Sequence, residues 1–292
     1  MADLNGVKNL GQQAEAKLEG AARAATHRAA PQLEALARFG YASKGVVYGT
    51  IGLLALSLVL GRQGAATDAQ GALLRLQDLP GGGWLMWLLV LGLIGYALWQ
   101  LIRATLDPER QGTGGKGLVK RLGYLVSGLG NMGVALFAAR LAREGTAARD
   151  ANNEQDTVRQ ILEWPGGQLL LGIAGLALLA VGANSIYSAY GAKFMKRIAL
   201  TDLGAQFSDT LKKIGQVGLS ARGLVLGIIG VSLLVAAFRD RSASVLGSGE
   251  VLTWLGYQPA GKILLGLVAL GTLCYGVWCF VQARYRRIRI EG

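Results

Sequence analysis

Basic and phenolic side chains at the start of three apolar runs are the residues of this sequence best suited to chemistry. The three entry segments are Gly40-Tyr41-Ala42-Ser43-Lys44-Gly45, Gly123-Tyr124-Leu125-Val126-Ser127-Gly128 and Gly218-Leu219-Ser220-Ala221-Arg222-Gly223. Cations and hydroxyl groups bind anions through charge-assisted hydrogen bonds. The candidate lipid-headgroup or anion site is therefore Lys44, Arg222, Ser127, Tyr41 and Tyr124. Two alternatives stay open: the long side chains only anchor helix ends in the headgroups, or they belong to a transport pathway.

Three polar side chains inside the apolar runs, Gln100, Asn131 and Asn184, are candidates for lining a polar path. Hydrogen bonds between packed helices are the simpler explanation for polar residues in such runs. None of the runs contains aspartate or glutamate. We therefore do not expect proton or sodium coupling through carboxylates.

The sequence pattern contains no set of residues suited to catalysis or metal binding. His27 is the only histidine, and the two cysteines, Cys274 and Cys279, lie on different faces of one predicted helix. The glycine-rich stretch 112–117 follows no predicted strand and lacks the spacing of a phosphate-binding loop. We expect no enzyme activity, no cofactor and no metal site.

Six long apolar runs must position the candidate residues. They lie at about 45–60, 84–102, 122–139, 168–192, 217–238 and 261–283. A helix needs about 20 apolar residues to cross a bilayer, so the first run must extend back through the first entry segment. Glycine accounts for 44 of the 292 residues, which favours close packing between helices. The sequence predicts an all-α polytopic membrane protein with six transmembrane helices.

The runs form three tandem repeats of two helices each. Between the two helices of each repeat, a short amphipathic segment ends at Pro80, Pro165 or Pro259, as expected for a helix in the headgroup zone. Counted from these prolines, equivalent positions of the second helices hold Tyr96, Val181 and Tyr275, and likewise Trp99, Asn184 and Trp278. Parallel repeats of this kind predict pseudo-threefold symmetry about an axis along the membrane normal. The predicted repeats are 36–108, 109–198 and 199–292.

The charge distribution predicts the orientation. The formal net charge of +12 resides on the side that holds both termini and the loops between repeats, and the opposite loops are neutral. The positive-inside rule places the basic side in the cytoplasm, with both termini, and the protein in the cytoplasmic membrane. Basic loops lie against anionic lipids, and no nucleic-acid-binding motif accompanies them.

Residues 1–35 are predicted to form a cytoplasmic amphipathic arm. They belong to a helical pattern over about residues 3–38, which Pro31 ends or kinks. The apolar face of this pattern is mostly alanine, so a weakly bound interfacial helix and a mobile arm remain alternatives. Docking onto a partner or onto the cytoplasmic loops is a third use.

The tripled Gly-Tyr-x-x-Lys/Arg-Gly entry, with a proline- and glycine-containing outer loop between paired helices, resembles the bacterial membrane family catalogued as domain of unknown function 1206. The resemblance covers about residues 36–290, although Ser127 replaces the basic residue in copy two and Leu219 the tyrosine in copy three. It implies an integral membrane protein and supplies no reaction, substrate or catalytic residue.

We expect a non-enzymatic envelope module that binds membrane lipids or a protein partner, including a second copy of itself. The alternative is a channel or uniporter for a small solute or ion along the pseudo-threefold axis.

Overall fold

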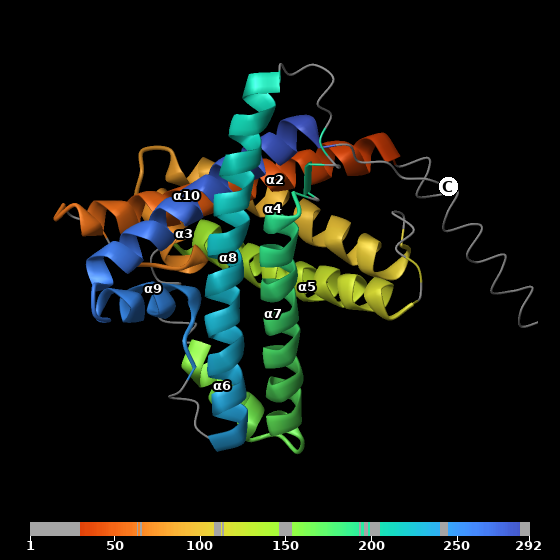
Figure 1. Ribbon diagram of the computed structural model, residues 1–292, viewed down its shortest axis with the longest axis vertical. Helices are drawn as coiled ribbons and strands as arrows, with labels where there is room; N and C mark the ends of the chain where they lie inside the picture. Colours follow the sequence, from red (N-terminus) through yellow and green to blue (C-terminus); the bar gives the residue numbers. More distant parts are fainter. Residues whose placement is uncertain are drawn as a thin grey trace, which may run out of the picture.

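The computed structural model consists of long and short helices that alternate in the same order three times (Figure 1). The six long helices are α2 (Ala30–Val59), α4 (Gly82–Thr105), α5 (Gly115–Glu144), α7 (Gly167–Tyr190), α8 (Ala205–Arg239) and α10 (Gly261–Tyr285). The three short helices are α3 (Ala69–Gln77), α6 (Glu154–Leu162) and α9 (Ser248–Gly256). The structure describes residues 30–62, 64, 66–107, 112, 114–145, 154–192, 194–195, 198, 205–239 and 245–286. The all-α class is confirmed, and each repeat is a long, a short and a long helix.

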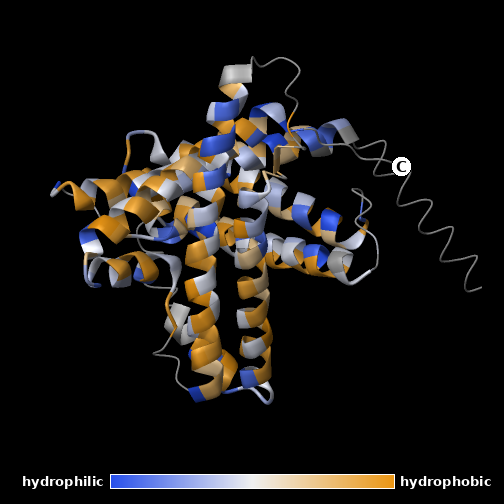
Figure 2. Ribbon diagram, in the orientation of Figure 1, coloured by the Kyte–Doolittle hydropathy of each residue, from blue (hydrophilic) through white to orange (hydrophobic). Residues whose placement is uncertain are grey.

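In the part of the chain that the structure describes, six helices are long and apolar enough to cross a membrane, as predicted. The candidate spans are Glu34–Val59, Gly82–Thr105, Gly117–Glu144, Gly167–Tyr190, Phe207–Arg239 and Gly261–Tyr285. Figure 2 shows the lower parts of α7 and α8 as almost continuously hydrophobic, with hydrophilic residues gathered at the upper end of α8. These features identify a multi-pass membrane protein.

The first span begins earlier than its apolar run. Helix α2 starts at Ala30, so Pro31 lies in its first turn. Proline is tolerated there because the first backbone N–H groups of a helix have no partner within the helix. Residues 30–35, predicted as the end of the N-terminal arm, therefore belong to α2. The rest of that predicted arm, residues 1–29, lies outside the described residues.

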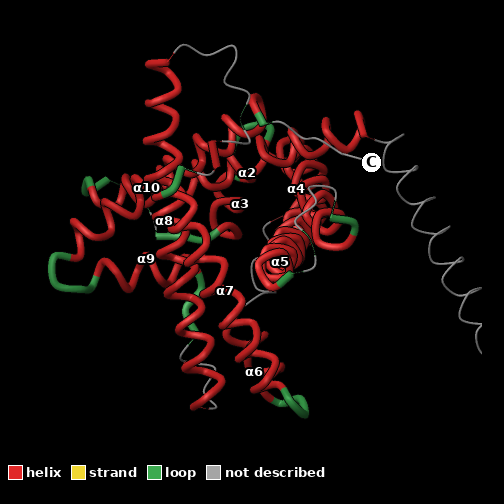
Figure 3. The backbone as a smooth tube through the Cα atoms, turned by 45° about the vertical axis from the view of Figure 1, so that its right-hand side comes forward, coloured by secondary structure: helices red, strands yellow, loops and turns green. Residues whose placement is uncertain are grey.

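The most extensive helix packing joins each repeat to the next. Helix α4 packs on α5, α7 packs on α8, and α10 returns to pack on α2, so the pairing closes into a ring. Figure 1 shows α7 and α8 running side by side along the vertical, and Figure 3 shows α5 nearly end-on, because the pairs point in different directions. This cyclic pairing is the pattern that the predicted pseudo-threefold arrangement requires.

The first glycine of each entry segment faces the second span of its own repeat. The pairs are Gly40 with Tyr96, Gly123 with Val181, and Gly218 with Tyr275. A β-carbon on Gly40 would lie 2.6 Å from the Tyr96 β-carbon, and one on Gly218 would lie 2.6 Å from the Tyr275 backbone nitrogen. Side chains at these two glycines would force the helices apart.

The second glycine of each entry segment faces the preceding repeat around the ring. Gly45 lies against Phe280, Gly128 against Leu101 and Gly223 against Ile186, and these three partners hold equivalent positions after the repeat prolines. The two glycines of a segment thus contact two different second spans. The entry segment is the part of the sequence that assembles the ring.

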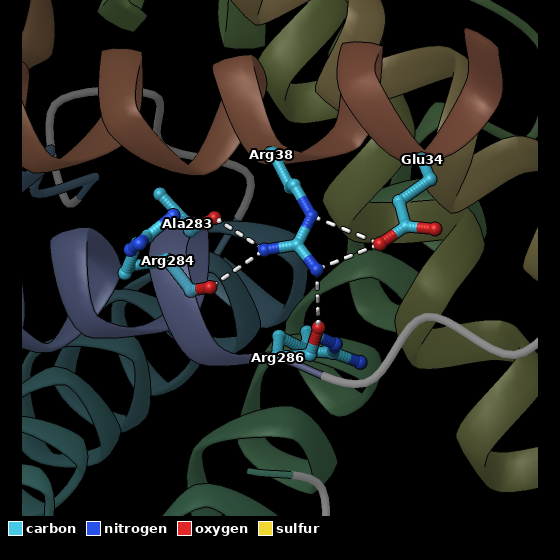
Figure 4. A network of polar contacts seen from close by, with 5 residues as sticks. All are labelled: Glu34, Arg38, Ala283, Arg284 and Arg286. Atoms are coloured by element: carbon cyan, nitrogen blue, oxygen red, sulfur yellow. Dashed lines mark hydrogen bonds and ion pairs between the residues drawn. The ribbon is translucent and has the colours of Figure 1, made fainter. Parts of the chain in front are cut away.

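A polar network fastens the first helix of the ring to the last. Arg38 on α2 donates hydrogen bonds to the carbonyl oxygens of Ala283 (3.1 Å), Arg284 (2.6 Å) and Arg286 (3.3 Å), at the end of α10 (Figure 4). Its guanidinium also pairs with Glu34 at 2.7 Å. Carbonyl groups at a helix C-terminus lack partners within the helix, so Arg38 caps α10 while it closes the ring.

Substitution of Arg38 by methionine is expected to lower the free energy of unfolding by about 2 kcal/mol, because several charge-assisted hydrogen bonds to α10 are lost. Thermal unfolding in detergent, followed by tryptophan fluorescence, measures the change. The matched control is Arg159→Met, which removes an exposed i,i+4 ion pair with Glu163. Equal melting temperatures for the two variants would show that the network adds nothing to stability.

Candidate functional site

The three repeats meet around a cavity of about 770 Å³, called here the central cavity. Equivalent positions from all three repeats line it. They are Tyr41, Tyr124 and Leu219 from the entry segments, and Tyr96, Val181 and Tyr275 from the second spans. Arg103, Ser188 and Gln282 form a third equivalent set, close to the ends of α4, α7 and α10. The cavity thus lies where the entry segments and the basic ends of the second spans come together.

The second repeat leaves the space open because its side chains are smaller. Val181 stands where the other repeats have Tyr96 and Tyr275, and Asn184 stands where they have Trp99 and Trp278. Both Val181 and Asn184 line the cavity. The two large aromatic pairs are packed: Tyr96 and Tyr275 are at most 5% exposed, and Trp99 and Trp278 at most 2%. Loss of two aromatic rings in one repeat of three accounts for a hollow at the centre.

Basic side chains surround the cavity. Arg103, Lys120, Arg222 and Arg286 are among the lining residues, and no aspartate or glutamate is among the described residues that line it. Four cations, with no carboxylate among the described side chains around them, create a positive potential that favours an anion.

Aromatic rings and an amide hold two of these guanidinium groups in place. Arg103 donates from Nη1 to Gln100 Oε1 at 2.6 Å, and its Cζ lies 3.6 Å from the centroid of the Tyr124 ring. The Arg286 Cζ lies 5.0 Å from the Tyr41 ring centroid. Such cation–π contacts fix the position of a guanidinium group at the cavity wall.

Arg222 on α8 carries another guanidinium group that lines the cavity. Its Cζ lies 5.2 Å from the Tyr275 ring centroid, and its Nε is buried without a hydrogen-bond partner in the part of the chain that the structure describes. A buried donor without a partner destabilises the folded protein, and a bound anion that accepts a hydrogen bond from it would remove this cost. Arg222 is therefore the best candidate for direct contact with a ligand.

Lys44 lies behind the cavity wall. Its side chain is 1% exposed, and its Nζ lies 4.1 Å from the centroid of Tyr96, 5.6 Å from that of Tyr48 and 5.9 Å from that of Tyr275. An amine enclosed by three rings does not reach the lipid headgroups, so simple anchoring does not describe it. Because Tyr96 and Tyr275 also line the cavity, only the thickness of one aromatic ring separates the Lys44 ammonium group from the cavity.

Apolar packing occupies the other half of the spans. One buried apolar cluster lies further from the cavity along the helices. It is formed by residues of α2, α4, α5 and α10 together with the short helices α3 and α9. The cluster includes Ile51, Leu73, Leu89, Phe137, Val251 and Val268. The cavity is thus confined to one end of the spans. Among the described residues, no group of three or more histidine, cysteine or carboxylate side chains could hold a metal ion.

A family model described as Domain of Unknown Function (DUF1206) matches three segments of the chain, residues 39–107, 122–192 and 217–286. The chain belongs to the DUF1206 family. Each matched segment of this DUF1206 protein covers most of the two long helices of one repeat, which confirms the predicted resemblance.

The DUF1206 protein is also 29% identical over 262 residues to the uncharacterized protein YxxB of Bacillus subtilis (strain 168). The alignment covers 89% of this chain and 94% of that protein. No solved structure matches the chain.

The structure brings most of the predicted site residues of this DUF1206 protein together. Tyr41, Tyr124, Ser127 and Arg222 line the central cavity, as do two of the proposed path residues, Gln100 and Asn184. Lys44 stands behind the wall, as described above. Asn131 is not among the described lining residues. Its side-chain amide donates to the Ser127 carbonyl oxygen at 2.6 Å, a bond within α5.

The sequence alone did not single out Arg103, Lys120 and Arg286 as site residues of the DUF1206 protein. They stand at the basic ends of apolar runs, where the positive-inside rule already explains a cation. One signal was present for Arg103, because the equivalent positions of the other repeats hold the polar residues Ser188 and Gln282. Polar residues at one position of three repeats point to a shared polar surface.

Proposed function

We propose that this protein is a non-enzymatic module of the cytoplasmic membrane that binds an anionic ligand in the central cavity. The supporting observation is the set of four basic lining side chains with no carboxylate among the described lining residues. Phosphate oxygens suit several guanidinium donors at once. The ligand is the phosphate of a membrane lipid or a soluble anion of the same chemistry.

The proposed orientation places the cavity at the inner leaflet. The entry segments and the ends of α4, α7 and α10 belong to the basic side of the topology, which the positive-inside rule assigns to the cytoplasm together with both termini. Anionic lipids give that membrane surface a negative potential that draws basic residues to it. A phosphate-binding cavity at the inner leaflet therefore lies at the same depth as the phosphate groups of anionic lipids.

The channel or uniporter alternative has less support. A path along the axis would have to pass the buried apolar cluster on the far side of the cavity. Flux of a small anion from liposomes that depends on Arg222 would favour transport over binding.

Replacement of Arg222 by glutamine is expected to weaken binding of phosphatidylglycerol by about tenfold, or about 1.4 kcal/mol. Lipid binding is measured by native mass spectrometry of the detergent-solubilised protein, titrated with phosphatidylglycerol or phosphatidylcholine. Binding of a soluble anion is measured by calorimetry with inorganic phosphate. Arg239→Gln is the matched control, because Arg239 is exposed near the other end of the same helix. Binding that is equal in both variants, or equal for the two lipids and absent for phosphate, would refute an anion site in the cavity.

A further inference from the structure

Of the three pairs of spans that belong to one repeat, the pair in the second repeat, beside the central cavity, is the most loosely packed. Helices α5 and α7 pack against each other far less extensively than α2 and α4, or α8 and α10. A β-carbon on Gly123 would meet Val181 only at an ordinary 3.4 Å, whereas the equivalent glycines lie against Tyr96 and Tyr275 at closer range. Half of the lining residues come from α5 and α7.

Bulkier residues at one contact account for this gap. In the first repeat, Gly92 lets α4 approach Ser43, and in the third, Gly271 lets α10 approach Ala221. The equivalent positions of the second repeat hold Val126 and Ala177, and both have side chains larger than their counterparts in the third repeat. A valine opposite an alanine keeps two helices further apart than a serine or alanine opposite a glycine.

The gap faces outward, toward lipid. At its edges Tyr187 is 61% exposed and Val119 is 52% exposed, and both also line the cavity. Further along the two helices the large exposed side chains are apolar, and they include Leu122, Leu125, Leu129, Ile173 and Leu176. The exposed apolar side chains along α5 and α7 can contact the acyl chains of a lipid, and the basic cavity next to them can bind its headgroup.

The route from the ends of the helices is partly covered. Phe194 and Ile198 line the cavity from the segment that follows α7, and Ile198 forms a β-bridge with Arg286 just beyond the end of α10. Phe194 also packs edge-on against Trp278, with ring centroids 4.8 Å apart. These contacts place apolar side chains across the helix ends, whereas among the described helices α5 and α7 pack only loosely beside the cavity.

We infer that the central cavity is entered sideways from the bilayer, between α5 and α7, and that its ligand is an anionic phospholipid with the phosphate at Arg222 and the acyl chains along α5 and α7. This inference rests on the proposed function and narrows it. A soluble anion needs no lateral opening with apolar flanks, whereas a membrane lipid needs one.

Photo-cross-linking tests the route. The full chain is reconstituted in phosphatidylcholine nanodiscs that contain phosphatidylglycerol with a photoactivatable acyl chain, and cross-linked peptides are mapped by mass spectrometry. We expect cross-links concentrated on α5 and α7, reduced about tenfold by Arg222→Gln, which matches the loss of one strong contact. Cross-links spread evenly over the three repeats would overturn the lateral route.

A second variant narrows the opening itself. Val181→Tyr restores the tyrosine that the other two repeats carry opposite their entry glycine, so the fold already accommodates this pair twice. We expect it to reduce the cross-links on α5 and α7 at least fivefold, while Leu270→Tyr, at an exposed position of α10, leaves them unchanged. Unchanged cross-linking in Val181→Tyr would overturn the inference and leave the anion site standing.

Calorimetry with inorganic phosphate distinguishes the lateral lipid route from the more general proposal of an anion-binding cavity. If inorganic phosphate binds in an Arg222-dependent way and phosphatidylglycerol does not cross-link at α5 and α7, the inference fails and the proposed function survives. If neither probe depends on Arg222, both fail.

Discussion

Gly218→Leu is expected to prevent stable folding of the protein. A β-carbon at this position would lie 2.6 Å from the Tyr275 nitrogen and 2.7 Å from its Cα. Both neighbours are backbone atoms of α10, so no rotation of a side chain can make room. The helices must separate, and the expected loss is about 3 kcal/mol or more, at the upper end of overpacking effects. Size-exclusion chromatography and thermal unfolding in detergent measure it.

The repeats supply a graded control for this prediction. Gly40→Leu is expected to be as damaging, because Gly40 has a comparably close contact with Tyr96. Gly123→Leu is expected to be mild, because the second repeat is looser at this point. Gly133→Leu, on an exposed turn of α5 with open space around it, is expected to be neutral or stabilising, since glycine is a poor helix former. Equal effects at Gly40, Gly123 and Gly218 would mean that the second repeat is no more open than the others.

The sequence predicted the helices and their correspondence because these depend on local composition. A span shows itself by length and hydropathy, and the entry segments and prolines align the three copies without any contact information. Local composition and the alignment of the three copies also predicted the short outer helices and the equivalence of Tyr96, Val181 and Tyr275. The early start of α2 did not, because Pro31 is compatible both with the end of one helix and with the first turn of another.

The cavity could not be predicted, because it depends on which faces meet. The departures of Val181 and Asn184 from the repeat pattern were visible in the sequence. Their consequence appears only when Tyr96, Tyr275 and Trp278 are seen to line one shared cavity. Periodicity identifies a face of a helix, but it does not say which helix covers that face. For the same reason Arg103 and Arg286 resembled ordinary basic ends of spans.

Lys44→Met is expected to stabilise the fold and to weaken ligand binding at the same time. Lys44 is buried, no ion pair or hydrogen bond is found for it among the described residues, and its Nζ lies near three aromatic rings. Removal of an ammonium group from water costs several kcal/mol, and cation–π contacts return about 0.5–2 kcal/mol each, so the cation is not fully compensated. Methionine fills a similar volume without the charge. We expect a gain of about 1 kcal/mol or more in the free energy of unfolding, by analogy with buried ion pairs, whose replacement by apolar groups of similar volume is often neutral or stabilising by about 1–4 kcal/mol.

The same substitution removes a positive charge that stands one ring away from the ligand. Binding of phosphatidylglycerol is therefore expected to fall about fivefold, or about 1 kcal/mol. Thermal unfolding and native mass spectrometry on one preparation measure both effects. Lys213→Met, at an exposed site on the basic side, removes the same net charge and is expected to change neither. A Lys44→Met protein that is less stable and binds lipid normally would show that Lys44 serves packing alone. A more stable protein with weaker binding would show that the fold keeps a costly buried charge for the sake of its ligand.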